Sequence, residues 1–107
     1  MLRIIAAAAF IFGCAVPALA DALDGDWCDG KGLHLSIKGP MISTPSGATL
    51  RGDYRRHAFD YVAPEGDPDA GLGIEIRQLS EDYMNFSRVR GGVPDAPELW
   101  KRCQMVS

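Results

Sequence analysis

Few residues in this chain carry the chemistry of metal binding or catalysis. The 107 residues include only two histidines, His34 and His57, and three cysteines. A zinc site needs three or four ligands, and the sequence has no C-x-x-C pair, no G-x-S-x-G turn and no glycine-rich loop followed by lysine. We therefore predict no metal site, no cofactor and no catalytic residues. Acid–base catalysis by a pair of carboxylates remains open, because a sequence does not show which carboxylates meet in space.

Positive charge is also scarce. Lys and Arg number 11 against 14 Asp and Glu, which gives a net charge of −3. Nucleic-acid binding requires a concentrated positive surface, and so does electrostatic attachment to anionic lipid. The charge balance therefore argues against both kinds of partner.

Long apolar runs are absent after the first residues of the chain. Arg3 precedes an apolar run from Ile4 to Val16, Pro17 ends it, and the small residues Ala18–Ala20 follow. This order is typical of a secretory signal peptide over residues 1–20. The run is too short for a transmembrane helix, which needs about 20 residues. The sequence predicts a periplasmic or secreted domain over residues 21–107, with no transmembrane helix.

A second processing site competes with cleavage after Ala20. The segment "IFGC" ends at Cys14 and resembles a bacterial lipoprotein site, although Phe12 fits it poorly. Lipidation of Cys14 would anchor the chain to a membrane, and one acyl chain alone binds only marginally.

Two cysteines, Cys28 and Cys103, remain after removal of the signal peptide. An exported protein meets an oxidising compartment, where a disulfide is the expected state of such a pair. A redox-active pair is disfavoured because the two residues lie far apart in the sequence. We predict one structural disulfide that joins the beginning of the domain to its end.

No segment of residues 21–107 shows a convincing helical stripe. Instead, "LHLSI" places Leu33, Leu35 and Ile37 on one face, and "LGIEIRQ" places Leu72, Ile74 and Ile76 on one face. Turn signals such as "TPSG" and "EGDPDAG" separate short segments. The pattern predicts an all-β domain, a small antiparallel barrel or sandwich of about 6–8 short strands.

The expected strands lie near residues 25–29, 33–38, 41–44, 48–51, 54–62, 72–79, 83–90 and 99–106. The last one is the least defined. The segment "DAPELWKRC" could open with a helical turn, since Asp95 could cap it and Pro97 and Glu98 suit its first positions.

The segment "GDYRRHAFDY" is richest in side chains that recognise ligands. As a regular strand it has no cleanly apolar face, and a β-bulge at Arg55–Arg56 would correct the phase. Tyr54, His57, Phe59 and Tyr61 would then all point inward, with both arginines at the margin.

The same segment supports a binding hypothesis. Guanidinium groups suit carboxylates and phosphates, so a small anionic ligand or an envelope protein would be the partner. Asp53 and Asp60 could instead neutralise the arginines. The candidate ligand-binding residues are Tyr54, Arg55, Arg56, His57 and Tyr61.

Each tryptophan of the chain lies close to a cysteine in the sequence. The disulfide would bring Trp27 and Trp100 into one neighbourhood with Arg102, in an aromatic cluster that closes the first strand onto the last. "GDW", residues 25–27, together with Arg102 loosely resembles the entry of lipocalin-type barrels, where a G-x-W tryptophan packs against a late arginine. That resemblance implies a closed or nearly closed sheet and no ligand specificity.

A second resemblance covers more of the chain. The TP-x-G turn at residues 44–47, the Y-x-R-H-x-F-x-Y strand at 54–61, the P-x-G-(E/D)-P loop at 64–68 and the W-x-R-C ending at 100–103 look like a group of small exported bacterial proteins of unknown function. The resemblance implies export and a disulfide, and no activity.

These observations favour a non-enzymatic binding or protein-interaction module of the cell envelope. The alternative is a proteinaceous inhibitor or stress factor that acts on an envelope hydrolase, because a rigid disulfide-tied β-domain lowers the cost of binding. A small hydrolase is the third hypothesis.

Overall fold

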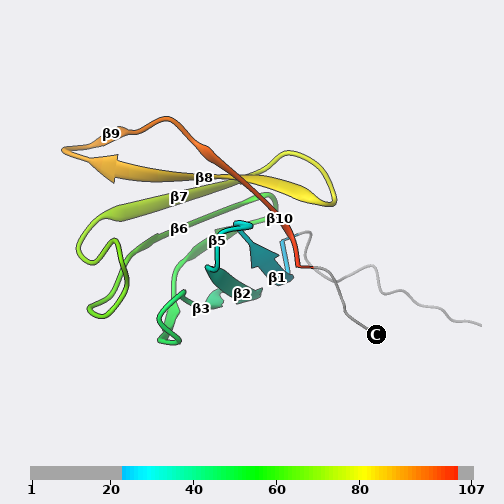
Figure 1. The fold of residues 1–107 in the computed structure, drawn as a ribbon, viewed down its shortest axis with the longest axis horizontal. Helices are drawn as coiled ribbons and strands as arrows, with labels where there is room; N and C mark the ends of the chain where they lie inside the picture. Colours follow the sequence, from blue (N-terminus) through cyan, green and yellow to red (C-terminus); the bar gives the residue numbers. More distant parts are fainter. Residues whose placement is uncertain (1–22, 104–107) are drawn as a thin grey trace, which may run out of the picture.

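The computed structural model describes residues 23–103, and the secondary structure of this part consists of β-strands (Figure 1). The strands are β1 (Gly25–Cys28), β2 (His34–Lys38), β3 (Met41–Ser43), β4 (Thr49–Arg51), β5 (Asp53–Arg55), β6 (Ala58–Val62), β7 (Gly73–Gln78), β8 (Tyr83–Arg90), β9 (Val93–Pro94) and β10 (Glu98–Arg102).

The strands form one antiparallel sheet in the order β4-β3-β2-β1-β10-β8-β7-β6-β5, with β9 paired to β8. The two ends of this order, β4 and β5, are consecutive in the chain, so the sheet curls into a nearly closed barrel (Figure 1). The all-β prediction is confirmed, and the barrel replaces the sandwich alternative. Ten strands exceed the predicted number, because one expected segment is divided by a turn and the short strand β9 was not expected.

A bend at Gly52 separates β4 from β5, the two strands at opposite ends of the sheet order. The amide of Gly52 donates to the carbonyl of Pro40 at 2.8 Å. A Cβ atom at Gly52 would lie 2.3 Å from the Phe59 ring and 2.8 Å from the carbonyl oxygen of Asp60. The bend therefore requires a residue without a side chain, because the backbone at Gly52, between β4 and β5, passes directly against β6.

The core follows the period-two pattern of the sequence. Leu35 and Ile37 on β2 and Ile74 and Ile76 on β7 are buried, as the alternation predicts. Aromatic rings fill the middle of the barrel, and the largest fully buried side chains include Trp27, Trp100, Phe59 and Phe86.

The predicted disulfide is present and joins β1 to the residue after β10. Cys28 and Cys103 are bonded, with their Cα atoms 5.1 Å apart. The strands themselves are paired, with Trp27 opposite Arg102 and Cys28 opposite Lys101. The disulfide thus fastens the one strand pair that joins the first strand of the domain to the last.

One predicted strand is wrong in detail, and one alternative for the end of the domain is not observed. Residues 54–62 form two strands, β5 and β6, with a tight turn at Arg56–His57, so no single bulged strand exists there. The last expected strand is present as β10, which begins at Glu98 in extended conformation, so the alternative of a helical turn near Asp95 is not observed in the described residues. The pairing of Glu98 with Phe86 on β8 accounts for this extension.

Several predictions fall on residues that lie outside the described part of the chain. These are the signal peptide over residues 1–20, the lipidation alternative at Cys14 and the end of the last expected strand, 104–106. Among residues 23–103, none belongs to a helix with the length and apolar character needed to cross a bilayer.

A loop over residues 63–72 joins the neighbouring strands β6 and β7. The carboxylate of Asp67 is buried, and it accepts hydrogen bonds from the Thr44 hydroxyl at 2.8 Å and the Ser46 amide at 3.0 Å. Thr44 and Ser46 follow β3, whereas Asp67 lies between β6 and β7. Asp67 therefore links segments that the sheet itself does not pair.

We expect Asp67→Ala to lower the free energy of unfolding by about 1–2 kcal/mol, because it leaves the buried Thr44 hydroxyl and the partly buried Ser46 amide without this acceptor. Equilibrium denaturation in urea measures the change. Glu65→Ala, an exposed carboxylate on the same loop, serves as control and should shift the value by less than about 0.5 kcal/mol. Equal effects of the two substitutions would contradict a bridging role for Asp67.

Candidate functional site

The turn between β5 and β6 presents three basic side chains to solvent. Arg55, Arg56 and His57 are all exposed. The guanidinium of Arg55 pairs with the carboxylate of Asp60 at 2.7 Å. Arg56 makes no ion pair with any residue in the described range 23–103. Its charge is therefore available to a partner. We call residues Arg55, Arg56 and His57 the basic tip.

Asp60 forms ion pairs with two arginines. Besides Arg55, it accepts a hydrogen bond at 2.6 Å from Arg77 of β7, and this bond is the main cause that raises the pKa of Arg77 above its ordinary value. Arg77 also lies 3.7 Å from the carboxylate of Glu75, so these two arginines have two acidic partners. Neutralisation by Asp60, one of the two sequence hypotheses, therefore applies to Arg55.

His57 is exposed, so its predicted inward orientation is wrong. It occupies the turn itself, and its Nδ1 lies 3.0 Å from Oε1 of Gln78 at the end of β7. The amide of Gln78 also donates to the carbonyl of His57 at 2.9 Å. These two contacts fix the basic tip against the neighbouring β7–β8 turn.

The two tyrosines of the predicted site lie on the inner side of the same hairpin. Tyr61 is 6% exposed, its ring meets Phe59 edge-on at 6.2 Å, and burial raises the pKa of its hydroxyl, with the Asp67 and Asp69 carboxylates adding to the rise. Tyr54 is half-buried, with its ring centre 6.4 Å from that of Phe59. The structure thus brings Arg55, Arg56 and His57 together and separates them from both tyrosines.

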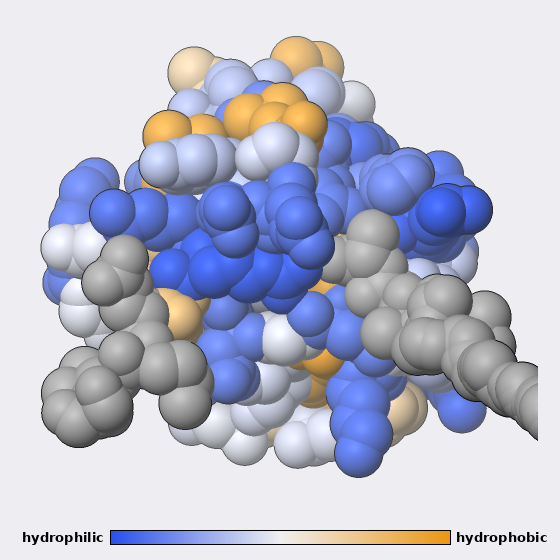
Figure 2. All heavy atoms as spheres, turned by 90° about the vertical axis from the view of Figure 1, so that its right-hand side faces the viewer, coloured by the Kyte–Doolittle hydropathy of each residue, from blue (hydrophilic) through white to orange (hydrophobic). Residues whose placement is uncertain are grey.

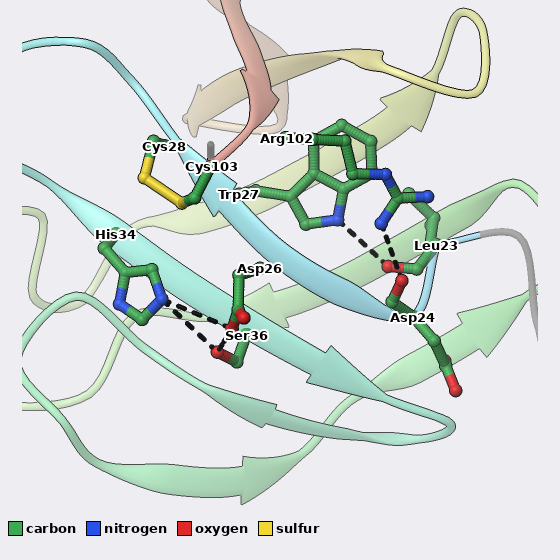
Figure 3. Close-up of polar contacts among 9 residues, drawn as sticks. All are labelled: Leu23, Asp24, Asp26, Trp27, Cys28, His34, Ser36, Arg102 and Cys103. Atoms are coloured by element: carbon green, nitrogen blue, oxygen red, sulfur yellow. Dashed lines mark hydrogen bonds and ion pairs between the residues drawn. A yellow bond between two sulfur atoms is a disulfide. The ribbon is translucent and has the colours of Figure 1, made fainter. Parts of the chain in front are cut away.

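A second polar group, which the sequence analysis did not identify, lies on the outer face of β1 and β2 (Figure 3). The Ser36 hydroxyl donates to the carboxylate of Asp26, and Nε2 of His34 lies 3.4 Å from the same oxygen and 3.5 Å from the hydroxyl. The hydrogen bond from Ser36 is the largest cause that lowers the pKa of Asp26, followed by effects of His34. The alternation of His34 and Ser36 was visible in the sequence, but the register that places Asp26 opposite Ser36 was not.

This group has the residue types of a hydrolase triad without its arrangement. In a triad, one nitrogen of the imidazole faces the serine and the other is held by the carboxylate. Here the same nitrogen of His34 faces both Ser36 and Asp26. The side chains of His34 and Asp26 are also more than half exposed to solvent. The geometry fits a surface hydrogen-bond network on paired strands.

The inner side of β1 closes one end of the barrel (Figure 3). Trp27 is fully buried and donates through Nε1 to the carbonyl of Leu23 at 2.9 Å. The guanidinium of Arg102 covers the Trp27 ring at 4.1 Å and donates to the carbonyls of Asp24 at 2.6 Å and Glu81 at 2.9 Å. The predicted contact between the first tryptophan and the late arginine is present. Trp100 stacks on Phe86 at 4.6 Å between ring centres.

Partly buried charged groups around Arg88 are paired with one another. Arg88 of β8 donates a hydrogen bond to Asp69 at 2.7 Å and forms an ion pair with Glu98 at 3.1 Å, and the hydrogen bond to Asp69 is the main cause of its raised pKa. Its guanidinium also lies 5.2 Å from the centre of the Phe86 ring. Arg88 is therefore committed to structural contacts.

Hollow space occurs on the outside of the barrel. A shallow hollow of about 340 Å³ lies over β6, β7 and β8, where Gly73 leaves a gap between Val62 and Val89. The interior is occupied by aromatic and aliphatic side chains. Among residues 23–103, no group of three or more His, Cys, Asp or Glu side chains could hold a metal ion.

No family model, curated protein or solved structure matches this chain. The function must therefore be argued from the geometry of the chain itself.

Proposed function

We propose that the protein is an exported, non-enzymatic interaction module that binds an anionic group of its partner through the basic tip. The observation that carries this proposal is the exposed charge of Arg56, which no residue in the range 23–103 neutralises, next to Arg55 and His57. Guanidinium groups bind carboxylates and phosphates in bidentate geometry. A turn held on a rigid sheet loses little conformational entropy on binding.

A binding role on the outer surface also follows from how the barrel is filled. Small barrels leave little room for a ligand once side chains occupy the interior, and Trp27, Trp100, Phe59 and Phe86 occupy it here. The Asp26–His34–Ser36 group lacks the arrangement for nucleophilic catalysis. Export through residues 1–20, to the periplasm or outside the cell, is part of the proposal, with lipid anchoring at Cys14 as its alternative.

The proposal predicts that Arg55→Gln combined with Arg56→Gln abolishes partner capture without loss of fold, because both side chains are exposed. Native mass spectrometry of the protein taken gently from its own envelope should show added mass on the wild type and none on the double variant. Lys31→Gln with Lys38→Gln removes two exposed charges elsewhere and should leave the added mass in place. Retention of the added mass by the arginine variant would refute the role of the basic tip.

The second candidate function, an inhibitor of an envelope hydrolase, is favoured by the loop over residues 63–72. Asp67 and Asp69 tie this loop to Thr44 and Arg88, so it is presented in one conformation. An inhibitor of this kind would lose its effect on substitution of exposed loop residues such as Glu65, and not on substitution of the basic tip. Substitution of Glu65 in one variant and of Arg55 and Arg56 in another therefore distinguishes the two functions.

A further inference from the structure

The side chain of Gln78 determines which ring nitrogen of His57 carries a proton. The amide nitrogen of Gln78 donates to the carbonyl of Ser80 at 2.9 Å, so its amide oxygen is the atom that faces the imidazole. This oxygen lies 3.0 Å from Nδ1 of His57. An amide oxygen only accepts hydrogen bonds, and Nδ1 is therefore the donor. The neutral ring of His57 accordingly carries its proton on Nδ1.

The other ring nitrogen, Nε2, is left for a partner. His57 is exposed, and its ring makes no further polar contact with residues 23–103. In the neutral ring Nε2 has a lone pair and no hydrogen, so it offers nothing to the oxygen atoms of an anion. Protonation converts Nε2 into a charged donor, which anionic oxygens bind strongly.

The backbone holds this ring next to an available guanidinium group. The amide of Gln78 donates to the carbonyl of His57 at 2.9 Å, so both the main chain and the ring of His57 are attached to the end of β7. Arg56 directly precedes His57 in the two-residue turn. It is exposed and makes no ion pair with the described residues. An anion at this turn therefore meets Arg56 and His57 as successive residues.

His57 differs from the charged residues around it in how it responds to pH. Those on β5, β6, β7 and the two adjoining turns are Asp53, Arg55, Arg56, Asp60, Glu75, Arg77, Glu81 and Asp82. Carboxylates and guanidinium groups keep their charges between about pH 5.5 and 8, whereas the charge of a histidine changes in this range. Figure 2 shows strongly hydrophilic residues across the end of the molecule where β7 and β8 meet, so this change takes place in contact with water.

We propose that the basic tip binds its anionic group more tightly at mildly acidic pH, because the protonated ring of His57 then joins Arg56 as a donor. This inference rests on the proposed function and adds the regulation of the same site. The two protonation states differ by one positive charge and one hydrogen-bond donor. By linkage, an anion that binds near neutral pH draws a proton onto the ring.

Sulfate is a suitable probe, because its charge is constant over this range whereas phosphate gains or loses a proton within it. The disulfide-bonded protein is titrated with sulfate at constant ionic strength, and the chemical shifts of the Arg56 and His57 amides give the dissociation constant. We expect the dissociation constant at about pH 5.5 to be at least about threefold lower than at about pH 8, a change typical of one exposed charged contact.

The two histidines of the chain supply a matched pair of variants. His57→Gln should bind sulfate with the same dissociation constant at the two pH values. His34→Gln removes the other histidine, which is also exposed but lies on the outer face of β2, and should keep the full pH dependence. Loss of the pH dependence in the His34 variant, with its retention in the His57 variant, would overturn the inference.

The ring nitrogens of His57 give a second and direct readout. Their ¹⁵N chemical shifts at the higher pH should show the proton on Nδ1, and addition of sulfate near neutral pH should increase the protonated fraction of the ring. A proton on Nε2 at the higher pH would contradict the contact with Gln78 and overturn the inference.

The wild-type titrations distinguish failure of the inference from failure of the proposed function. Equal dissociation constants at the two pH values would overturn the inference and leave the proposed function standing, because the arginines alone would then bind the anion. Absence of sulfate-dependent shifts at the basic tip at both pH values would overturn the inference and the proposed function together.

Discussion

Replacing Cys28 and Cys103 together by serine is expected to lower the free energy of unfolding by roughly 4 kcal/mol. The bond spans a sequence separation of 75 residues, and cross-linking so long a loop removes much of the conformational entropy of the unfolded chain. A domain of this size has a stability of only about 5–15 kcal/mol. The disulfide therefore supplies a large fraction of the total.

Guanidinium denaturation of the oxidised wild type and the double serine variant measures this effect. Reduced wild type should behave as the variant does, which separates the loss of the bond from the change of side chain. A difference below about 1 kcal/mol would show that the pairing of β1 with β10, together with the contact of Arg102 with Trp27, suffices to join the ends of the domain.

Gly52→Ala is expected to cost about 2–3 kcal/mol, a large effect for one added methyl group. The new Cβ would lie 2.3 Å from the Phe59 ring and 2.8 Å from a backbone oxygen. Phe59 is fully buried and cannot move aside without disturbing the core. The substitution should therefore force the bend between β4 and β5 away from β6 and open the barrel.

Gly73→Ala is the matched control, because its Cβ would lie 3.4 Å from the Cβ of Val89, which is an ordinary van der Waals contact. Thermal unfolding should show a clear loss for the Gly52 variant and a shift within about 1 kcal/mol for the Gly73 variant. A Gly52 variant as stable as the wild type would mean that the barrel does not need the close passage of the two strands. Amide hydrogen exchange at β5 and β6 would locate the opening.

Local patterns predicted the strands and the disulfide well. The alternation around Leu35 and around Ile74 identified the buried faces, because period-two burial leaves a direct mark in the sequence. The turn at Arg56–His57 was missed for a physical reason. Two-residue hairpin turns usually contain Gly, Asn or Asp. The turn at Arg56–His57 contains none of these, so the sequence showed no interruption between β5 and β6.

Contacts between distant residues explain the remaining differences. The bend at Gly52 depends on Phe59 and Pro40, and the polar group of Asp26 with Ser36 depends on the β1–β2 register. The sequence contains these residues but not their pairing. Of the candidate site residues, Arg55, Arg56 and His57 lie together on the exposed turn, whereas Tyr54 and Tyr61 belong to the inner side.

The place of β10 between β1 and β8 has a consequence for the order of events during synthesis. Strand β10 is the last strand of the domain, yet it joins the half that holds β1–β4 to the half that holds β7 and β8. A nascent chain without residues 98–102 has two unjoined sheets and an uncovered core, and native contacts over long sequence separations form slowly. The domain can thus complete its fold only after residues 98–102 have been made, and the cross-link to Cys103 follows later still.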